Sequence, residues 1–455
     1  MRVMKTNSFS RNKSQSKESI ISTTLATKTI NRIARSCEYI KRKGGKISPR
    51  NLIIGFMTMV SKHRNTYSDW ATEIGLLENK TISKQSLNER MQSPTESFIK
   101  AVVEKAMSEK MEQMQTKKIK GVLKHFKQVK IDDSTTLHLP DELAEAFPGN
   151  VSRGEKKAQA KIHAMYNLTD NNFSFFHLHS FSNNDQSLSA NVLPYLQKGD
   201  LCIRDLGFSV TDVLSKFIET GIYFISRKKY NHKVFDLETG AEINVLQLVR
   251  KKGFIDQSVI IGKEQPLQVR LIVIPVPKPQ AAERKRKART DRDKRLNHSL
   301  EYYQLLDYNI YITNISTEQC DAENIFELYK LRWRIEIIFK SWKSCFSLEK
   351  LIHHQCKNEI RVKCIIYLML LYIYLFHVIW WKYCENKINS ESENNNCQKS
   401  PLSILKMANF FRQHFTAILS DKTPKIIFEQ IKAHCTYDKR NDRDNASVFQ
   451  FKLAA

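Results

Sequence analysis

The chain has 455 residues, 41% of them hydrophobic, which is enough for two or three domains with sizeable cores. It carries 73 lysines and arginines against 47 aspartates and glutamates, a formal net charge of +26 with a pI near 9.6. This balance favours a polyanionic partner, nucleic acid ahead of an anionic membrane. The 9 cysteines include no C-x-x-C pair, which argues against a zinc site or a disulfide framework and fits a reducing cytoplasm.

No membrane or export segment is expected. The basic N-terminus lacks the apolar run of a signal peptide, so residues 1–44 are predicted to be a mobile basic tail. Residues 364–381 are apolar over the length of a membrane span. They contain His377 and many aromatic side chains and follow the helix at 329–343 after a short basic linker. We therefore predict a buried helix of the same core.

The segment 45–124 is predicted to be helical. Ser48 and Pro49 can start one helix, and Ser83 can cap another that covers residues 81–90. The second helix carries residue types that contact phosphates and base edges in helix-turn-helix proteins, although the same residues would suit a solvated face. They are Lys84, Gln85, Asn88 and Arg90.

Strand patterns begin at Phe126. Alternation places Val129 and Asp133 on one side of a strand and Asp132 on the other, and we expect this strand to end at residues 132–135. Alternating runs at 161–168 and 173–179 predict a hairpin, and a helix is predicted at 186–197. A short apolar strand then stops at Asp205. Further strand-like runs cover 222–227, 259–262, 267–276 and 309–315.

Residues 329–343 are predicted to form one helix with two different faces. At about 100° per residue, four polar-tipped side chains share an arc of about 60°. A separate apolar stripe would seat the helix on a core. By itself, the pair Arg332 and Glu336 could be a surface ion pair without further role. The polar arc consists of Tyr329, Arg332, Glu336 and Lys343, and the apolar stripe of Leu331, Ile335, Ile338 and Trp342.

The spacing Tyr-x2-Arg-x3-Glu-x6-Lys resembles the YREK signature of the insertion-sequence-four (IS-four) family of DDE transposases. All four positions and their gaps match. In that family the first catalytic aspartate precedes a small residue and a hydroxyl or second small residue, which matches Asp133 and leaves Asp132 as the close competitor. The sequence from Asp205 to Phe208 resembles the second catalytic block, and Arg227 matches a position suited to the DNA backbone.

The resemblance covers about residues 45–380 and implies an α/β fold with a ribonuclease-H-like mixed sheet. The catalytic core would comprise residues 125–227 and 321–384, interrupted by a β-rich insertion domain at 228–320. An all-helical DNA-binding domain at 45–124 would precede it, and a helical region at 385–455, a candidate for dimerisation, would follow. The basic run at 283–295 is either a phosphate-contacting arm or a solvated face.

The implied function is that of a bacterial transposase. It would bind terminal inverted repeats, cut the element out through a hairpin intermediate and join it to target DNA. Asp133, Asp205 and Glu336 would hold two Mg²⁺ ions, with Mn²⁺ as a substitute, because two metals can hold the attacking and leaving oxygens. The other matching residues, Tyr329, Arg332, Lys343 and Arg227, would bind DNA.

A homodimer is expected because two DNA ends must be held together. The protein would work in the bacterial cytoplasm, at the nucleoid. Two other functions stay open: a ribonuclease-H-like nuclease that cuts without joining, and a catalytically silent DNA-binding protein.

Overall fold

The computed structural model describes residues 25–42, 45–113, 121–152, 154–230, 232–290, 299–352, 357–377, 402–420 and 424–436. Most of the predicted basic tail, the second half of the basic run and the segment 385–400 lie outside these ranges. The chain divides into two compact units. The helical unit contains Met1–Ala106, Tyr367–Gln398 and Lys406–Thr436, and the sheet unit contains Met107–Ile366, Lys399–Leu405 and Tyr437–Ala455.

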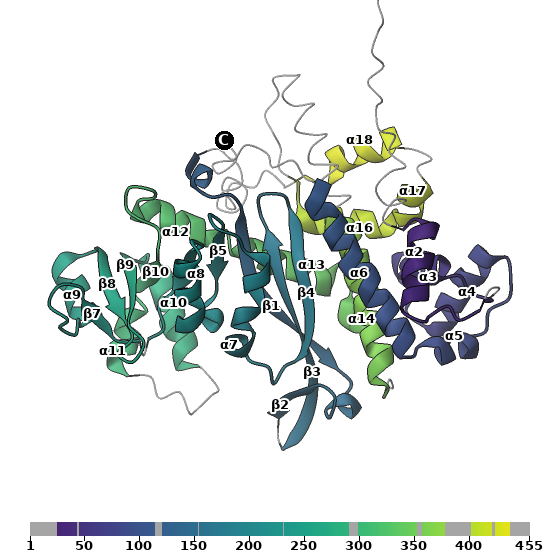
Figure 1. The fold of residues 1–455 in the computed structure, drawn as a ribbon, viewed down its shortest axis with the longest axis horizontal. Coiled ribbons are helices and arrows are strands. Elements are labelled where there is room, and N and C mark those ends of the chain that lie inside the picture. The colour runs from purple at the N-terminus through teal and green to yellow at the C-terminus, as the bar shows by residue number, and fades with distance from the viewer. Residues whose placement is uncertain are drawn as a thin grey trace, which may run out of the picture. The chain divides into compact units, whose positions relative to one another are not determined.

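The sheet unit is built on one mixed ten-stranded sheet (Figure 1). The strand order is β2-β3-β1-β5-β6-β10-β9-β8-β7, and β4 also pairs with β3. Strands β1, β5 and β6 are parallel neighbours, whereas the remaining pairs are antiparallel. The strands are β1 (Val129–Leu139), β2 (Pro148–Ser152), β3 (Glu155–Asn167), β4 (Asn172–Ser180), β5 (Leu201–Arg204), β6 (Tyr223–Arg227), β7 (Val234–Asp236), β8 (Ile255–Ile261), β9 (Leu267–Pro275) and β10 (Tyr308–Thr313).

The predicted hairpin is present as β3 and β4, and the short strand that stops at Asp205 is β5. The predicted end of the first strand is wrong, because β1 stays paired with β3 as far as Leu139. The helix predicted at 186–197 is also not regular. A single α-helical turn, α7 (Asp185–Leu188), leads into the 3₁₀ helix η3 (Ser189–Tyr195), whose Pro194 has no N–H to donate to an α-helical bond.

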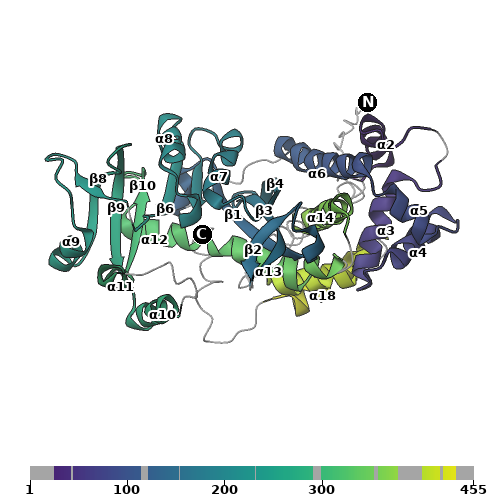
Figure 2. The same cartoon turned by 90° about the horizontal axis from the view of Figure 1, so that it is seen from below.

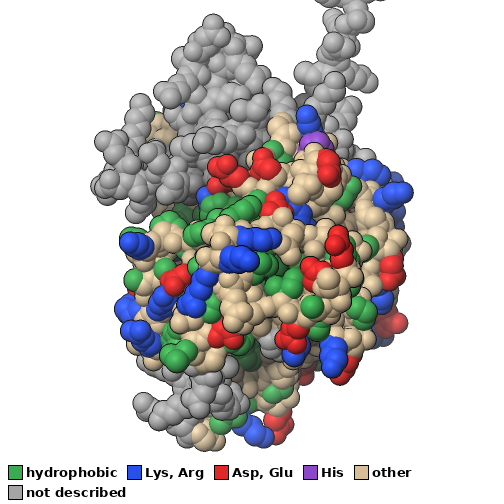
Figure 3. All heavy atoms as spheres, turned by 90° about the vertical axis from the view of Figure 1, so that its left-hand side faces the viewer, with side chains coloured by type: hydrophobic (Ala, Val, Ile, Leu, Met, Phe, Trp, Pro, Cys, Tyr) green, Lys and Arg blue, Asp and Glu red, His purple; other side chains and the backbone are tan. Residues whose placement is uncertain are grey.

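Residues 228–320, the predicted insertion, are rich in strands as expected. Strands β7 to β10 continue the same sheet as β1, β5 and β6, because β10 pairs antiparallel with β6. Lys and Arg side chains are scattered among Asp and Glu side chains on the face viewed in Figure 3. The helices of this segment are α9 (Val245–Lys252), α10 (Lys278–Arg289) and α11 (Leu300–Leu305).

The described half of the basic run lies on α10 and is partly used inside the protein. Arg284 donates to the Asn309 side chain at 2.8 Å, and Lys285 pairs with Asp307 at 2.7 Å. Arg286 pairs with Glu283 on its own helix. The contacts of Arg284 and Lys285 hold α10 against the start of β10. All three pairings leave fewer cations of α10 to bind phosphates.

Helices cover both faces of the sheet, α12 (Ala322–Lys330) and α13 (Trp333–Ser344) on one face and α7 and α8 (Thr211–Glu219) on the other (Figure 2). Each face has its own apolar core, and alternation along the strands decides which residues enter which core. On β5, Leu201 and Ile203 belong to the core beneath α12, whereas Cys202 belongs to the core beneath α8. Polar residues at the strand ends follow the same alternation.

The helical unit confirms both predicted serine caps. Ser48 accepts from the Asn51 N–H at the start of α3, and Ser83 accepts from the Ser86 N–H at the start of α5. Its described helices are α2 (Thr27–Ser36), α3 (Pro49–Ser61), α4 (Tyr67–Glu78), α5 (Lys84–Arg90), α17 (Phe415–Ser420) and α18 (Pro424–His434), with parts of α6 (Ser93–Gln113), α14 (Glu359–Tyr374) and α16 (Ile404–Gln413).

The apolar segment predicted at 364–381 forms most of α14. Within the described part of the chain, Glu359–His377 is the one helix long and apolar enough to cross a membrane, and 83% of its apolar window is buried inside the protein. The sequence assigns this helix to the catalytic core. Its residues from Tyr367 onward instead group with the helical unit, where the Tyr374 hydroxyl donates to the Ala106 carbonyl at 2.8 Å.

Candidate active site

Two aspartates leave neighbouring parallel strands on the same face of the sheet. The register pairs Asp132 of β1 with Arg204 of β5, so the next residues, Asp133 and Asp205, lie side by side. Because side chains alternate, these two face the side of α12 and α13, and the residues before them face the opposite side. The structure thus places Asp133, and not its competitor Asp132, beside Asp205.

Glu336 lies on one of the helices that pack on the sheet. The predicted single helix at 329–343 is in fact two, because α12 ends at Lys330 and α13 begins at Trp333. At this junction the Arg332 and Ile335 N–H groups donate to carbonyls three residues back instead of four, which tightens the chain. Helix α13 is seated by three fully buried residues of the predicted stripe, namely Ile335, Ile338 and Trp342.

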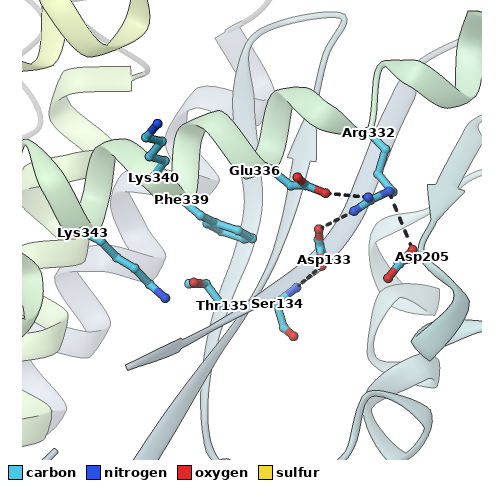
Figure 4. A pocket seen from close by; sticks show the side chains of 9 residues that line it. All are labelled: Asp133, Ser134, Thr135, Asp205, Arg332, Glu336, Phe339, Lys340 and Lys343. Carbon is cyan, nitrogen blue, oxygen red and sulfur yellow. Dashed lines mark hydrogen bonds and ion pairs between the residues drawn. The ribbon is translucent and has the colours of Figure 1, made fainter. Parts of the chain in front are cut away.

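Arg332, at the start of α13, lies at the centre of the three carboxylates (Figure 4). Its Nη1 is 3.1 Å from Asp133 Oδ2 and its Nη2 is 2.5 Å from Glu336 Oε1. Its Nε is 3.8 Å from Asp205 Oδ1. Burial acts to lower the pKa of Arg332, but Tyr329 and the three carboxylates raise it, so this side chain stays charged. One guanidinium therefore brings the three predicted acids together.

The most deeply placed of these acids is Asp133. Burial raises its pKa to about 7, and the nearby carboxylates of Asp205 and Asp132 add to that effect. Arg332 and the Ser134 N–H act in the opposite direction. A pKa this far above the usual value means that the ionised form of Asp133 is destabilised. A further cation at the site would stabilise that ionised form.

The carboxylates line an open cavity of about 380 Å³. Two exposed lysines of α13 reach its rim, the predicted Lys343 and also Lys340, which the YREK spacing does not include. Lys340 could be found from sequence only by its position one helical turn after Glu336. The lining is Asp133, Ser134, Thr135, Asp205, Arg332, Glu336, Phe339, Lys340 and Lys343.

Tyr329 and Arg227 lie beside this cavity and are not among its lining residues. The Tyr329 ring is buried, its hydroxyl lies 3.4 Å from Asp205 Oδ1, and burial raises its pKa above the usual range. The guanidinium carbons of Arg227 and Arg332 lie 5.6 Å and 5.9 Å from the centre of that ring. These cation–π contacts indicate that Tyr329 supports the two arginines.

Sequence reasoning missed a second polar cluster behind the aspartates. Asp132 and Arg204 are both fully buried, and Arg204 donates two hydrogen bonds to Asp132 Oδ2. His163 Nε2 lies 2.6 Å from the other oxygen of the same carboxylate. Arg204 and His163 hold the pKa of Asp132 below its usual range against the raising effect of burial. The register of the strands, which sequence does not reveal, brings these residues together.

The three carboxylates fit a divalent metal ion. All the donors are hard oxygens, which suit Mg²⁺ and Mn²⁺ better than softer ligands would. The pKa of Asp133 is raised and all three acids lie close to Arg332, so a further positive charge would stabilise their carboxylates. Asp133, Asp205 and Glu336 are accordingly the residues that could hold a metal.

A mixed α/β fold that brings three partly buried acids together beside a basic rim is an arrangement suited to an enzyme that acts on phosphodiesters. The chain matches the transposase DDE domain family over residues 124–375, more than half of its length, and belongs to that family. Members of this family generally use divalent metal ions.

The chain is similar to curated insertion-sequence transposases. It is 30% identical to the transposase of element IS231E from Bacillus thuringiensis subsp. finitimus, over 75% of each chain. It is 26% identical to the transposase of IS1151 from Clostridium perfringens, over 70% of this chain and 72% of the relative. Among solved structures, the chain is similar to a cryo-EM structure of the piggyBac transposase synaptic complex with hairpin DNA. The match covers 94% of this chain and 87% of that chain, with 9% sequence identity and a TM-score of 0.43. The protein is a bacterial insertion-sequence transposase of the DDE type.

Proposed function

We propose that this transposase is a cut-and-paste enzyme of the IS-four type, with Tyr329, Arg332, Glu336 and Lys343 as its YREK residues. The observation that carries the proposal is the convergence of Asp133, Asp205 and Glu336 on Arg332, from two strands and a helix far apart in the sequence. Cleavage would proceed through a hairpin intermediate and end in strand transfer to target DNA.

In this proposal Asp133, Asp205 and Glu336 hold two Mg²⁺ ions, for which Mn²⁺ can substitute. When bound by these three acids, the ions would supply charge stabilisation for the attacking and leaving oxygens of a phosphodiester. The nucleophile is a water molecule in the first cut and in hairpin opening, and a DNA 3′-hydroxyl in hairpin formation and strand transfer. Each step forms one phosphorus–oxygen bond and breaks another, so no covalent link to the protein is needed.

The cations of the site would bind and orient the DNA. Arg332 has five N–H donors and can exchange part of its carboxylate contacts for a bidentate contact with a phosphate. Lys343 and Lys340 are exposed at the rim and suit the phosphates on either side of the scissile bond. Arg227, whose guanidinium carbon lies 5.6 Å from the centre of the Tyr329 ring, would contact the DNA backbone next to these phosphates.

The remaining parts of the proposal concern DNA ends and assembly. Helices α4 and α5 would act as a helix-turn-helix that binds the terminal inverted repeats. On α5, Lys84 and Gln85 are exposed, whereas Arg90 lies over the Tyr39 ring and is partly used inside the protein. A homodimer would hold two ends together in the cytoplasm. Strands β4-β3-β1-β5-β6, with three parallel neighbours next to a hairpin, support a ribonuclease-H-like core.

The test uses Glu336→Gln and Asp133→Asn, which keep shape and remove the charge that a metal needs. Both variants should bind element ends and fail to nick them in Mg²⁺. Glu145→Gln, an exposed acid of the same unit, is the matched control and should nick at the normal rate. Strand transfer from pre-cut ends separates a transposase from a nuclease that only cuts. Normal nicking by Glu336→Gln would refute the assignment of the site.

A further inference from the structure

Three histidines gather on the hairpin behind the catalytic face. The register pairs His163 of β3 with His177 of β4 and Lys161 with His179, so the three imidazoles lie on one face of adjacent strands. One ring nitrogen from each lies within 4.8 Å of those of the other two. This is the face of Asp132 and Arg204, opposite to Asp133, so the cluster is separate from the catalytic carboxylates.

His163 is oriented as metal-binding histidines usually are. Its Nε2 lies 2.6 Å from Asp132 Oδ1, and both side chains are fully buried. A carboxylate held by Arg204 is an acceptor, so it fixes the proton on Nε2 and leaves the Nδ1 lone pair free. Nδ1 is buried and has no hydrogen-bond partner among the described residues. A carboxylate on one ring nitrogen and a metal on the other is a recurring arrangement in proteins.

The other two histidines add two further nitrogen donors to the cluster. His179 Nε2 is also buried without a hydrogen-bond partner in the described chain. His177 stacks on Phe175 with ring centres 4.4 Å apart, and its Nε2 lies 3.5 Å from the Tyr195 hydroxyl, at the limit of a hydrogen bond. Two buried polar atoms without partners in one cluster are uncommon, because each costs desolvation energy.

We propose that His163, His177 and His179 bind a divalent transition metal of the zinc class. Imidazole nitrogens suit Zn²⁺ and Co²⁺ and are poor ligands for Mg²⁺. Three histidines leave one tetrahedral position for water or an added ligand. The cysteine spacing in the sequence argues against a zinc site, but these ligands are histidines that only the pairing of β3 with β4 brings together.

The surrounding charges allow such an ion. Asp132 is paired with Arg204, and Lys161 is paired with Asp185 at 2.8 Å, so both pairs are neutral overall. The metal would therefore be held by neutral imidazoles, as in other three-histidine sites. It would tie β3 to β4 and, through Asp132, to the strand that carries Asp133. Its expected effect is to stiffen the support of the catalytic aspartate, with no part in the reaction itself.

The experiment measures Zn²⁺ and Co²⁺ binding to the full chain, with excess Mg²⁺ present. Asp133→Asn/Glu336→Gln serves as the background, because it removes two of the three carboxylates of the candidate active site and the excess Mg²⁺ competes for the third. We expect one Zn²⁺ per chain, a rise in melting temperature on its addition and a tetrahedral visible spectrum with Co²⁺. All three signals should be lost in His179→Gln and in His177→Gln, and kept in His125→Gln, an exposed histidine of the same unit.

His179→Gln is the principal variant, because His179 is only half-buried. The melting temperature of this variant without metal should therefore stay near that of the parent protein. X-ray absorption spectroscopy of the Zn²⁺-loaded parent reports the ligand atoms around the zinc ion without a further substitution. We expect the scattering pattern of imidazole ligands. Equal binding by the parent and His179→Gln, or zinc held by sulfur ligands, would overturn the proposal. The cluster would then be an aromatic packing group around His163, Phe175 and Phe208.

Discussion

Asp132 and Arg204 form a fully buried ion pair in which Nε and Nη2 of Arg204 donate to Asp132 Oδ2 at 3.0 Å and 2.7 Å. Each stands directly before an aspartate of the candidate active site, and the two are partners in the parallel register of β1 and β5. The pair therefore adds a side-chain link between the two strand ends at the position that Asp133 and Asp205 follow.

Breaking this pair should destabilise the fold strongly. Asp132→Asn or Arg204→Met leaves one buried charge without its partner, which typically costs about 3–5 kcal/mol. The double variant should lose much less than the sum of the two, because both charges are then gone. Urea unfolding of all four proteins measures this difference. Lys157→Ala, which breaks an exposed pair with Asp141, is the control and should change little. Additive losses would show that the pair is not coupled.

Arg332 should compete with divalent metal ions for the three acids. In Arg332→Gln the carboxylates lose their only close guanidinium among the described residues, so their mutual repulsion is relieved chiefly by a bound ion. We expect Mn²⁺ to raise the melting temperature of Arg332→Gln more than that of the wild type, while DNA nicking falls. Thermal melting across a Mn²⁺ series measures the first effect.

Arg334→Gln is the matched control for that series, because Arg334 lies on the same helix and donates to Asn171 instead of the acids. Its Mn²⁺ response should equal that of the wild type. A Mn²⁺ response in Arg332→Gln smaller than the wild-type response would mean that the guanidinium helps to retain the metal.

Lys343→Ala should weaken DNA binding through loss of a phosphate contact. Each phosphate contact on duplex DNA contributes roughly −0.9 to the slope of log affinity against log salt. The slope of the variant should therefore be shallower by about that amount, and Lys340→Ala should behave in the same way. Fluorescence anisotropy on end DNA over a salt series provides the slopes. An unchanged slope in both variants, equal to that of the exposed α9 variant Lys251→Ala, would place the DNA elsewhere.

Lys228 should make stability depend on alkaline pH. Burial lowers its pKa from 10.5 to about 8 against a smaller opposing effect of Glu301. Between these values the unfolded chain keeps a proton that the folded chain has lost, so stability should rise as pH increases from about 8 to 10.5. Lys228→Met removes this rise and should be the more stable protein at pH 7, by up to about 3 kcal/mol. Urea unfolding at pH 7 and 10 tests this, and parallel pH profiles would contradict it.

Much of the local structure followed from sequence because it depends on neighbours in the chain. Ser48 and Ser83 cap their helices as predicted, since a cap needs only the N–H groups two or three residues on. Alternation along β1 correctly separated Asp133 from Asp132 by face. The apolar stripe of α13 is buried as its spacing indicates. The membership in the DDE transposase family confirms the coarser part of the resemblance, whereas the IS-four family, the YREK motif and the roles of the site residues stay predictions.

Only the tertiary structure decided how these pieces meet, because contacts between distant residues leave no local pattern. Pairing with β3 extends β1 to Leu139, and pairing of β10 with β6 joins the strands of residues 228–320 to the rest of the sheet. Arg332 lies at the break between α12 and α13, at the centre of three acids, and local sequence does not reveal this position. The same register buries Asp132 with Arg204 and gathers the three histidines. Side-chain alternation is local and could be read in advance, whereas strand register is set by long-range packing and could not.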